Sequence, residues 1–344
     1  MITLGIETSC DETAVAVLED GFEIRSNLIA RQEHLHERFG GVVPEVAARA
    51  HVEALNPLLA DALDGAGCDF SDLGGVAVTI GPGLVGALLV GMAAAKSIAL
   101  AVRAPLIGVN HLEGHYWANF LEHGPPDPPY VALIVSGGHT MLVHVPELFR
   151  HVVLGQTLDD AAGEAFDKVA RLLGLGFPGG PALDAAARSG DPDAVRFPRA
   201  MEGSGDLDFS LSGLKTAVLR YVRTEQAAGR EIDVPDLAAS FQEAIVDVQV
   251  TKTMRAARET GARAVLLGGG VVANTRLREL ILAAGLEAGI EVRFPSMALC
   301  TDNGAMIAVA GASRLARGER TGLGVGADPA MELAGWGRPS ERRP

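Results

Sequence analysis

A repeated strand–turn–strand plan is the feature that most constrains the fold of this chain. Residues 2–7 are apolar and β-branched, a polar turn runs from Thr8 to Thr13, and residues 14–19 form a second strand. Residues 130–135, a turn from Ser136 to Thr140 and residues 141–145 repeat this plan. Each hairpin opens a segment of mixed strands and helices. The repetition therefore predicts an α/β fold of two duplicated lobes with a central cleft.

Composition limits the class of protein. A length of 344 residues suits two lobes that each have a sizeable core, and 48% hydrophobic residues indicate a globular chain. The net charge of −14 argues against broad nonspecific nucleic-acid binding, although it leaves room for a small basic patch or a basic partner. The three cysteines have no metal-type spacing and fit a reducing compartment.

Two apolar segments, one at the N-terminus and one in the chain interior, could suggest a membrane protein, but neither predicts one. Residues 2–6 are too short and uncharged to be a signal peptide. The most apolar run, Leu84 to Val102, is interrupted by Lys96 and is rich in alanine and glycine. A buried helix explains this run better than a membrane span. We therefore expect a soluble, cytoplasmic protein with no membrane association.

Two histidines, His111 and His115, are the first candidate metal ligands. They lie four residues apart and share one face of a helix, where two imidazoles can bind one transition-metal ion. Gly114 between them suggests that another group approaches closely, since glycine inside a helix is otherwise unfavourable. The spacing alone fits a hydrogen-bonded pair without metal equally well.

Several glycine-rich turns suit the binding of a nucleotide. Gly137 and Gly138 allow a ligand to approach the backbone. A strand ending in three glycines, followed by a helix with Asn274 at its start, suits the edge of a nucleotide. It matches neither the dinucleotide-binding fingerprint nor the P-loop. Asp167 and Asp184 flank a glycine- and proline-rich break and are candidates to bind hydroxyl groups.

Nine short stretches lie in order along the chain, at residues 6–13, 81–83, 111–115, 135–140, 167–170, 178–181, 209–216, 268–274 and 300–304. Taken together, they resemble the tRNA threonylcarbamoyl-adenosine transferase family of the bacterial TsaD type. The resemblance is collinear over residues 1 to about 325, with small departures at Met141, Val272 and Thr275.

The resemblance implies an actin-like, sugar-kinase-like fold. It implies an N-terminal lobe over residues 1–108, completed by a C-terminal helix over 304–325. A C-terminal lobe over 109–303 would carry the metal and nucleotide motifs, and residues 326–344 would be a flexible tail.

The resemblance also implies the site residues. His111, His115 and Asp302 would hold one divalent metal ion per subunit, with iron favoured and zinc possible. Asp11 and Glu12 would act on the amine of the substrate that accepts the transferred group, either by orienting it or by relaying its proton. The substrate-binding residues would be Ile134, Val135, Ser136, Gly137, Gly138, Asp167, Gly180, Asp184 and Asn274.

The reaction implied is a group transfer to tRNA. The threonylcarbamoyl group of threonylcarbamoyl-AMP would pass to the exocyclic amine of the adenosine next to the anticodon, in tRNAs that read ANN codons, and AMP would be released. Because an acidic chain is poorly suited to hold tRNA alone, the implied complex with a paralogous partner, TsaB, and an ATPase, TsaE, is consistent with its charge.

Two other activities deserve comparison. A metalloendopeptidase of the H-E-x-x-H type has its base directly after the first histidine. Here Glu113 is two residues on, about 200° around the helix from His111, so it faces away from a shared metal. An actin-like ATPase or sugar kinase would fit the lobes and glycine turns, but a histidine pair for metal is unexpected there.

Overall fold

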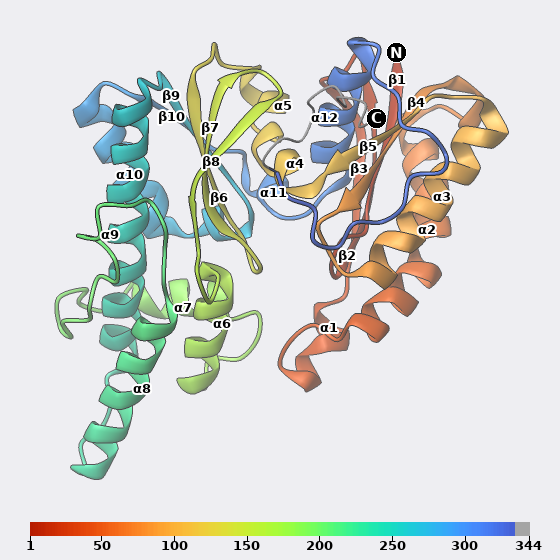
Figure 1. The fold of residues 1–344 in the computed structure, drawn as a ribbon. Coiled ribbons are helices and arrows are strands. Elements are labelled where there is room, and N and C mark those ends of the chain that lie inside the picture. Colours follow the sequence, from red (N-terminus) through yellow and green to blue (C-terminus); the bar gives the residue numbers. More distant parts are fainter. Residues whose placement is uncertain (334–344) are drawn as a thin grey trace, which may run out of the picture. The chain divides into compact units, whose positions relative to one another are not determined.

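The computed structural model describes residues 1–333, and these form two compact units (Figure 1). Residues 1–125 and 295–333 make up the first unit, and residues 126–294 make up the second. Each unit contains its own five-stranded sheet.

The sheet of the first unit has the strand order β3-β2-β1-β4-β5. Strands β1, β2 and β3 are antiparallel neighbours, whereas β4 and β5 run parallel to β1. The five strands are β1 (Ile2–Glu7), β2 (Glu12–Glu19), β3 (Glu23–Arg31), β4 (Leu73–Gly81) and β5 (Leu106–Asn110).

Helices cover both faces of this sheet, and the alternation of side chains along β1 shows why. Leu4 and Ile6 point into a core that residues of α2 and α3 complete. Gly5 points to the opposite face, where a Cβ would lie 2.3 Å from the carbonyl oxygen of Gly304, so α12 packs directly on the strand. The helices are α1 (Glu33–His36), α2 (Pro44–Ala66), α3 (Val85–Val102), α4 (His111–Trp117), α5 (Phe120–His123), α11 (Met297–Cys300) and α12 (Gly304–Ala316), with 3₁₀ turns η1 (Glu37–Phe39) and η2 (Phe70–Asp72).

Helix α3 is long and apolar enough to cross a membrane, yet it is a core helix of the first unit. Its buried residues, among them Met92, Ala95 and Ala99, pack in the same core as β1 and β4. The prediction of a buried helix over this run is confirmed. Leu89 and Leu100 on its other side remain exposed.

The second sheet repeats the first. Its order is β10-β9-β6-β7-β8, with β6, β7 and β8 antiparallel and with β9 and β10 parallel to β6. The hairpin strands thus occupy the same places relative to the parallel strands in both sheets, and the predicted duplication is confirmed. The strands are β6 (Tyr130–Val135), β7 (Thr140–Glu147), β8 (Arg150–Gln156), β9 (Ala264–Gly268) and β10 (Glu291–Arg293).

Five helices and one 3₁₀ turn complete the described part of the second unit. Their core is rich in aromatic and aliphatic side chains, including Phe166, Leu214 and Phe241. The elements are α6 (Ala162–Leu172), α7 (Gly179–Ala187), α8 (Ser212–Ala227), α9 (Val234–Thr260), η3 (Gly270–Ala273) and α10 (Thr275–Ala288).

The boundary between the units differs from the predicted one at residue 108. The chain leaves the first unit at residue 125, so α4 belongs with the N-terminal sheet. The physical reason is close packing between α4 and α12: a Cβ at Gly114 would lie 2.8 Å from Cδ1 of Ile307. The C-terminal helix of this unit ends at Ala316, not at residue 325.

The predicted flexible tail also differs from the structure over residues 326–333. The backbone N–H of Asp328 donates to the carbonyl of Ile80 at 2.8 Å, and that of Gly83 donates to the carbonyl of Pro329 at 3.2 Å. Leu333 is buried. Backbone pairing and apolar burial therefore fix this segment to the first unit, while residues 334–344 of the predicted tail lie outside the described residues.

Candidate functional site

Helix α4 and the turn before α12 bring His111, His115 and Asp302 together. Nε2 of His115 lies 3.4 Å from Oδ1 of Asp302, and Nε2 of His111 lies 3.7 Å from the same oxygen. One ligand atom from each residue falls within 4.8 Å of the others. Ligands of a tetrahedral zinc site are about 3.3 Å apart, because the bonds are about 2.0–2.1 Å long. This group could hold a metal ion.

Helix caps set the ends of both segments. Asn110 precedes α4, and its Oδ1 accepts the backbone N–H of Leu112 at 2.9 Å. Asn303 directly follows Asp302, and its Oδ1 accepts the N–H of Met306 at 2.9 Å. Asparagine is among the preferred N-cap residues, so the local sequence starts α4 at His111 and starts α12 two residues after Asp302.

Burial and charge act against each other in this group. Burial alone would lower the pKa of His111, but the carboxylates of Asp302 and Glu7 outweigh it and raise that pKa to about 9. Burial, together with the charges of Glu7 and Asp11, raises the pKa of Asp302 to about 6 against the opposing effect of His111. The carboxylates thus favour a positive charge among them, which a proton or a metal cation can supply.

The other nitrogen of His111 faces away from Asp302. Its Nδ1 lies 3.1 Å from Oε2 of Glu7 and 3.1 Å from Oγ of Ser9. Glu7 precedes His111 by 104 residues, so no local sequence pattern indicates this contact.

Asp11 and Glu12, the candidate catalytic residues, lie in the same unit, where Asp11 ends the turn after β1 and Glu12 is the first residue of β2. Burial, and then the charges of Asp302 and Asp11, raise the pKa of Glu12 well above its ordinary value. Burial and the charges of Asp11 and Asp302 likewise raise the pKa of the Cys10 thiol. The turn therefore shares the acidic surroundings of Asp302.

Glu113 is fully buried and bonded to Arg314 of α12. Nη2 of Arg314 lies 2.9 Å from each carboxylate oxygen of Glu113, and Nε lies 3.2 Å from Oε2. This bidentate pair ties α4 to α12, and its position agrees with the prediction that Glu113 faces away from the metal ligands. Arg314 is 201 residues away from Glu113, so no local sequence pattern identifies it as the partner.

The predicted nucleotide-binding residues all lie in the second unit. Ile134 and Val135 end β6, and Ser136, Gly137 and Gly138 form the turn into β7. The turn is closed by a hydrogen bond from Ser136 N–H to the carbonyl of His139 at 2.8 Å. Apart from the neighbouring residues in the chain, a Cβ at Gly137 or Gly138 would meet no atom of residues 1–333 within 4 Å, so the backbone of this turn is open to a ligand.

The glycine-rich break after α6 is held against that helix. Oδ1 of Asp167 accepts the N–H of Gly179 at 2.8 Å, and a Cβ at Gly179 would lie 2.6 Å from the Cα of Asp167. Gly180 has open space where its Cβ would be. Asp167 therefore positions the segment that contains Gly180, and both were predicted as substrate-binding residues.

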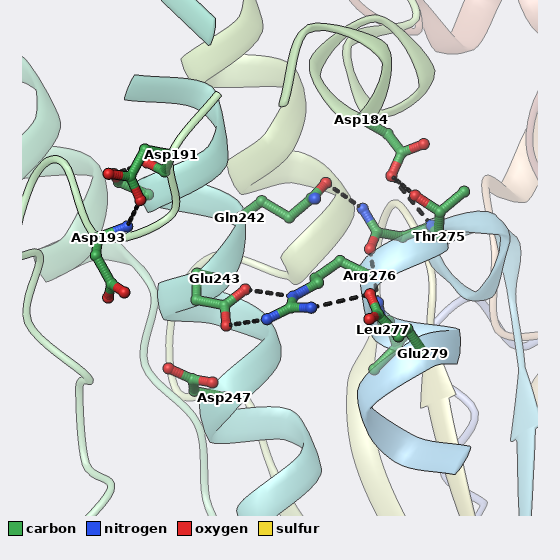
Figure 2. A network of polar contacts seen from close by, with 12 residues as sticks. Asp184, Asp191, Asp193, Gln242, Glu243, Asp247, Thr275, Arg276, Leu277 and Glu279 are labelled. Carbon is green, nitrogen blue, oxygen red and sulfur yellow. Dashed lines mark hydrogen bonds and ion pairs between the residues drawn. The ribbon is translucent and has the colours of Figure 1, made fainter. Parts of the chain in front are cut away.

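Asp184 and Asn274 belong to one polar network (Figure 2). Oδ1 of Asp184 accepts both the N–H and the hydroxyl of Thr275, at 3.0 and 2.8 Å. Asn274 caps α10 through Leu277 N–H and donates from Nδ2 to Oε1 of Gln242 at 2.6 Å. The contacts link α7, α9 and α10, and neither Gln242 nor Thr275 was identified as a network member from the sequence.

The turns that follow β6 and β9 lie at the carboxyl-terminal ends of the parallel strands of the second sheet. In the parallel pair β6–β9, Ile134 is opposite Gly268, so the turns that follow the two strands are neighbours. The N–H of Gly163, in the first turn of α6, donates to the carbonyl of Ser136 at 3.1 Å. Ligands of α/β sheets commonly bind outside the carboxyl ends of parallel strands.

Solved structures of proteins with low sequence identity to this chain have the same fold. The chain superposes on HypF of T. kodakarensis with a TM-score of 0.63 at 14% identity, covering 92% of this chain and 48% of that one. It superposes on component A of the (R)-2-hydroxyglutaryl-CoA dehydratase of Acidaminococcus fermentans with a TM-score of 0.55 at 15% identity, covering 92% and 99%. These likenesses concern the fold alone.

Sequence comparison gives the family. Residues 23–309 match the model of TsaD, tRNA N6-adenosine threonylcarbamoyltransferase. The chain is 53% identical over 330 residues to the enzyme of that name from Moorella thermoacetica, covering 96% of each. It is 49% identical over 332 residues to the one from Clostridium perfringens, covering 96% of this chain and 98% of that one. The chain belongs to the TsaD family of tRNA N6-adenosine threonylcarbamoyltransferases.

Proposed function

We propose that His111, His115 and Asp302 hold one divalent metal ion, iron in preference to zinc, for the transfer of threonylcarbamoyl from threonylcarbamoyl-AMP. The observation that carries this proposal is the convergence of three ligand atoms within 4.8 Å. Two imidazoles and one carboxylate with open positions are typical of non-haem iron(II) sites, although zinc accepts the same donors. When bound, the ion would polarise the carbamoyl carbonyl as a Lewis acid.

The nucleotide part of the substrate is assigned to the second unit. The open backbone at Gly137 and Gly138, and its place at the carboxyl ends of parallel strands, support this assignment. Asp167 and Asp184 are proposed to contact the ribose hydroxyls. The remaining proposed contacts are Ile134, Val135, Ser136, Gly180 and Asn274.

The acceptor is the exocyclic amine of the adenosine next to the anticodon, in tRNAs that read ANN codons. Its nitrogen attacks the carbamoyl carbon, the new C–N bond forms, and the bond to the phosphate oxygen of AMP breaks. The amine gives up one proton in this step. We assign its orientation and proton acceptance to Asp11 and Glu12, because their turn shares the surroundings of Asp302.

The partners proposed are the paralogue TsaB and the ATPase TsaE, acting in the cytoplasm. A chain of net charge −14 needs cationic surface from elsewhere to hold tRNA firmly. An apolar groove between α2 and α3 supports a protein partner, which we take to be the paralogue, since apolar grooves of this kind mark protein interfaces. The large apolar residues of its lining are Val52, Leu55, Leu59, Phe70, Val90 and Ile98, and the lining also includes Asn56, Ala93, Ala94 and Ser97.

A reconstituted transfer assay tests the proposal. Purified protein, threonylcarbamoyl-AMP, unmodified tRNA and the two partners should yield modified adenosine and one AMP per transfer, detected by mass spectrometry. Omission of the adenylate should stop both products. AMP release without modified nucleoside would contradict the proposed acceptor.

A further inference from the structure

Glu7 is a buried acid that the transfer reaction does not use directly. It is the last residue of β1, and its side chain has no exposed surface. Strand alternation places Glu7 on the same face of β1 as Gly5, which is the face covered by α12. It therefore points to the opposite side of the sheet from the core residues Leu4 and Ile6.

Three donors surround its carboxylate. Oε1 accepts the backbone N–H of Ser9, and Oε2 accepts the hydroxyl of Thr79. Oε2 also lies 3.1 Å from Nδ1 of His111. A carboxylate that receives three donors acts as acceptor only, so the hydrogen shared with His111 belongs to the imidazole. Both oxygens are occupied, which makes Glu7 a poor direct metal ligand.

The contact decides which nitrogen of His111 is available. A neutral imidazole carries its proton on one nitrogen and a lone pair on the other. With Nδ1–H directed at Glu7, the lone pair is on Nε2, the nitrogen that lies 3.7 Å from Oδ1 of Asp302. Ser9 Oγ, also 3.1 Å from Nδ1, supports the same ring orientation.

We propose that Glu7 is a positioning residue of the metal centre, which fixes His111 as an Nε2 ligand by accepting a hydrogen bond from its Nδ1–H. The inference rests on the proposed metal site. Outer hydrogen-bond partners of this kind orient metal-binding histidines and increase their basicity.

Metal affinity of matched variants tests the proposal. Glu7→Gln keeps the size of the side chain but removes its charge, and it should weaken Zn²⁺ binding by about 10–100-fold in a chelator competition. Thr8→Val is the control, because Thr8 is the next residue, is equally buried, and donates its hydroxyl to the carbonyl of Ala87 at 2.9 Å, away from His111. It should bind Zn²⁺ within about twofold of the parent.

Equal affinities of Glu7→Gln and Thr8→Val would overturn the positioning role. Unchanged Zn²⁺ affinity in His111→Ala would instead overturn the metal site itself, so the two failures are distinguishable. The parent protein provides a test that needs no variant: in the ¹⁵N spectrum of the Zn²⁺-loaded form, His111 should be protonated at Nδ1 and metal-bound at Nε2. The reverse assignment would contradict the proposal even if Glu7→Gln does not fold.

Discussion

The three side chains of the metal group, His111, His115 and Asp302, are polar, and none of them belongs to the apolar core that β1, α2 and α3 form. His111→Ala, His115→Ala and Asp302→Ala should therefore each lose bound metal while the protein stays folded. Elemental analysis and circular dichroism check the two expectations. His34→Ala, at an exposed histidine of the same unit, is the matched control and should keep its metal. Full metal content in all three ligand variants would contradict the assignment.

The raised pKa of His111 gives the metal-free protein a characteristic pH dependence. Because the pKa is near 6.5 in the unfolded chain and about 9 in the folded one, protonated His111 stabilises the fold fully below pH 6.5. This contribution should disappear as the pH rises to 9. Denaturant unfolding of metal-free protein should show the decline, and a bound cation should reduce it. A flat profile over this range would contradict the charge balance described here.

Gly137 and Gly138 provide a test of the nucleotide assignment. Valine at either position should weaken binding of the adenylate at least about tenfold, because its side chain would occupy the space of the ligand. Since a Cβ at these positions meets no protein atom within 4 Å, the fold should tolerate the change. Calorimetry measures the affinity, and an unchanged value would make both glycines simple turn residues.

At the level of elements, α4 carries the two histidines and Asp302 lies in the turn before α12, while the buried Glu113–Arg314 pair joins α4 to α12. Glu113→Ala should destabilise the protein by about 3–5 kcal/mol, because it leaves a buried guanidinium without its main counter-charge. Replacing both residues, as Glu113→Leu with Arg314→Met, should restore much of the loss. Urea unfolding measures both. If Glu113→Ala kept parental stability and lost only activity, the result would favour the metalloendopeptidase alternative, in which a glutamate is the base.

Elements that depend on local pattern could be predicted from the sequence. The hairpins at residues 2–19 and 130–145 follow from strand alternation and turn residues. The boundary at 108 was misplaced because the partner of α4 is α12, almost 200 residues later, and local pattern carries no record of that packing. The docking of residues 326–333 through Asp328 N–H and Leu333 was missed for the same reason.

The site residues also fall into those that local sequence pattern indicates and those that only the tertiary fold brings together. The spacing of His111 and His115 indicates a possible metal pair, but Asp302 entered only through the family resemblance. Its distance of 3.4 Å from His115 depends on the tertiary fold. Glu7, Thr275 and Gln242 likewise act through contacts that join distant segments.

At the level of the whole molecule, the chain has two properties that bear on its partners: a net negative charge and a groove between α2 and α3. If the proposed partner TsaB binds this groove, Val52→Glu, at a side chain that is 62% exposed, should prevent the association without unfolding the protein. Size-exclusion chromatography of the mixed proteins measures this. Phe22→Glu, at an exposed residue outside the groove, is the control and should still form the complex. A stable complex with Val52→Glu would place the interface elsewhere.

The central claim is that the metal group takes part in threonylcarbamoyl transfer to tRNA. The most direct measurement is the initial rate of modified adenosine formation by the complete mixture, comparing parent, His34→Ala and the three ligand variants. The parent and His34→Ala should form the product at equal rates. His111→Ala, His115→Ala and Asp302→Ala should be slower by several orders of magnitude, because a lost Lewis acid removes several kcal/mol of transition-state stabilisation. Parental rates in the folded ligand variants would contradict the claim.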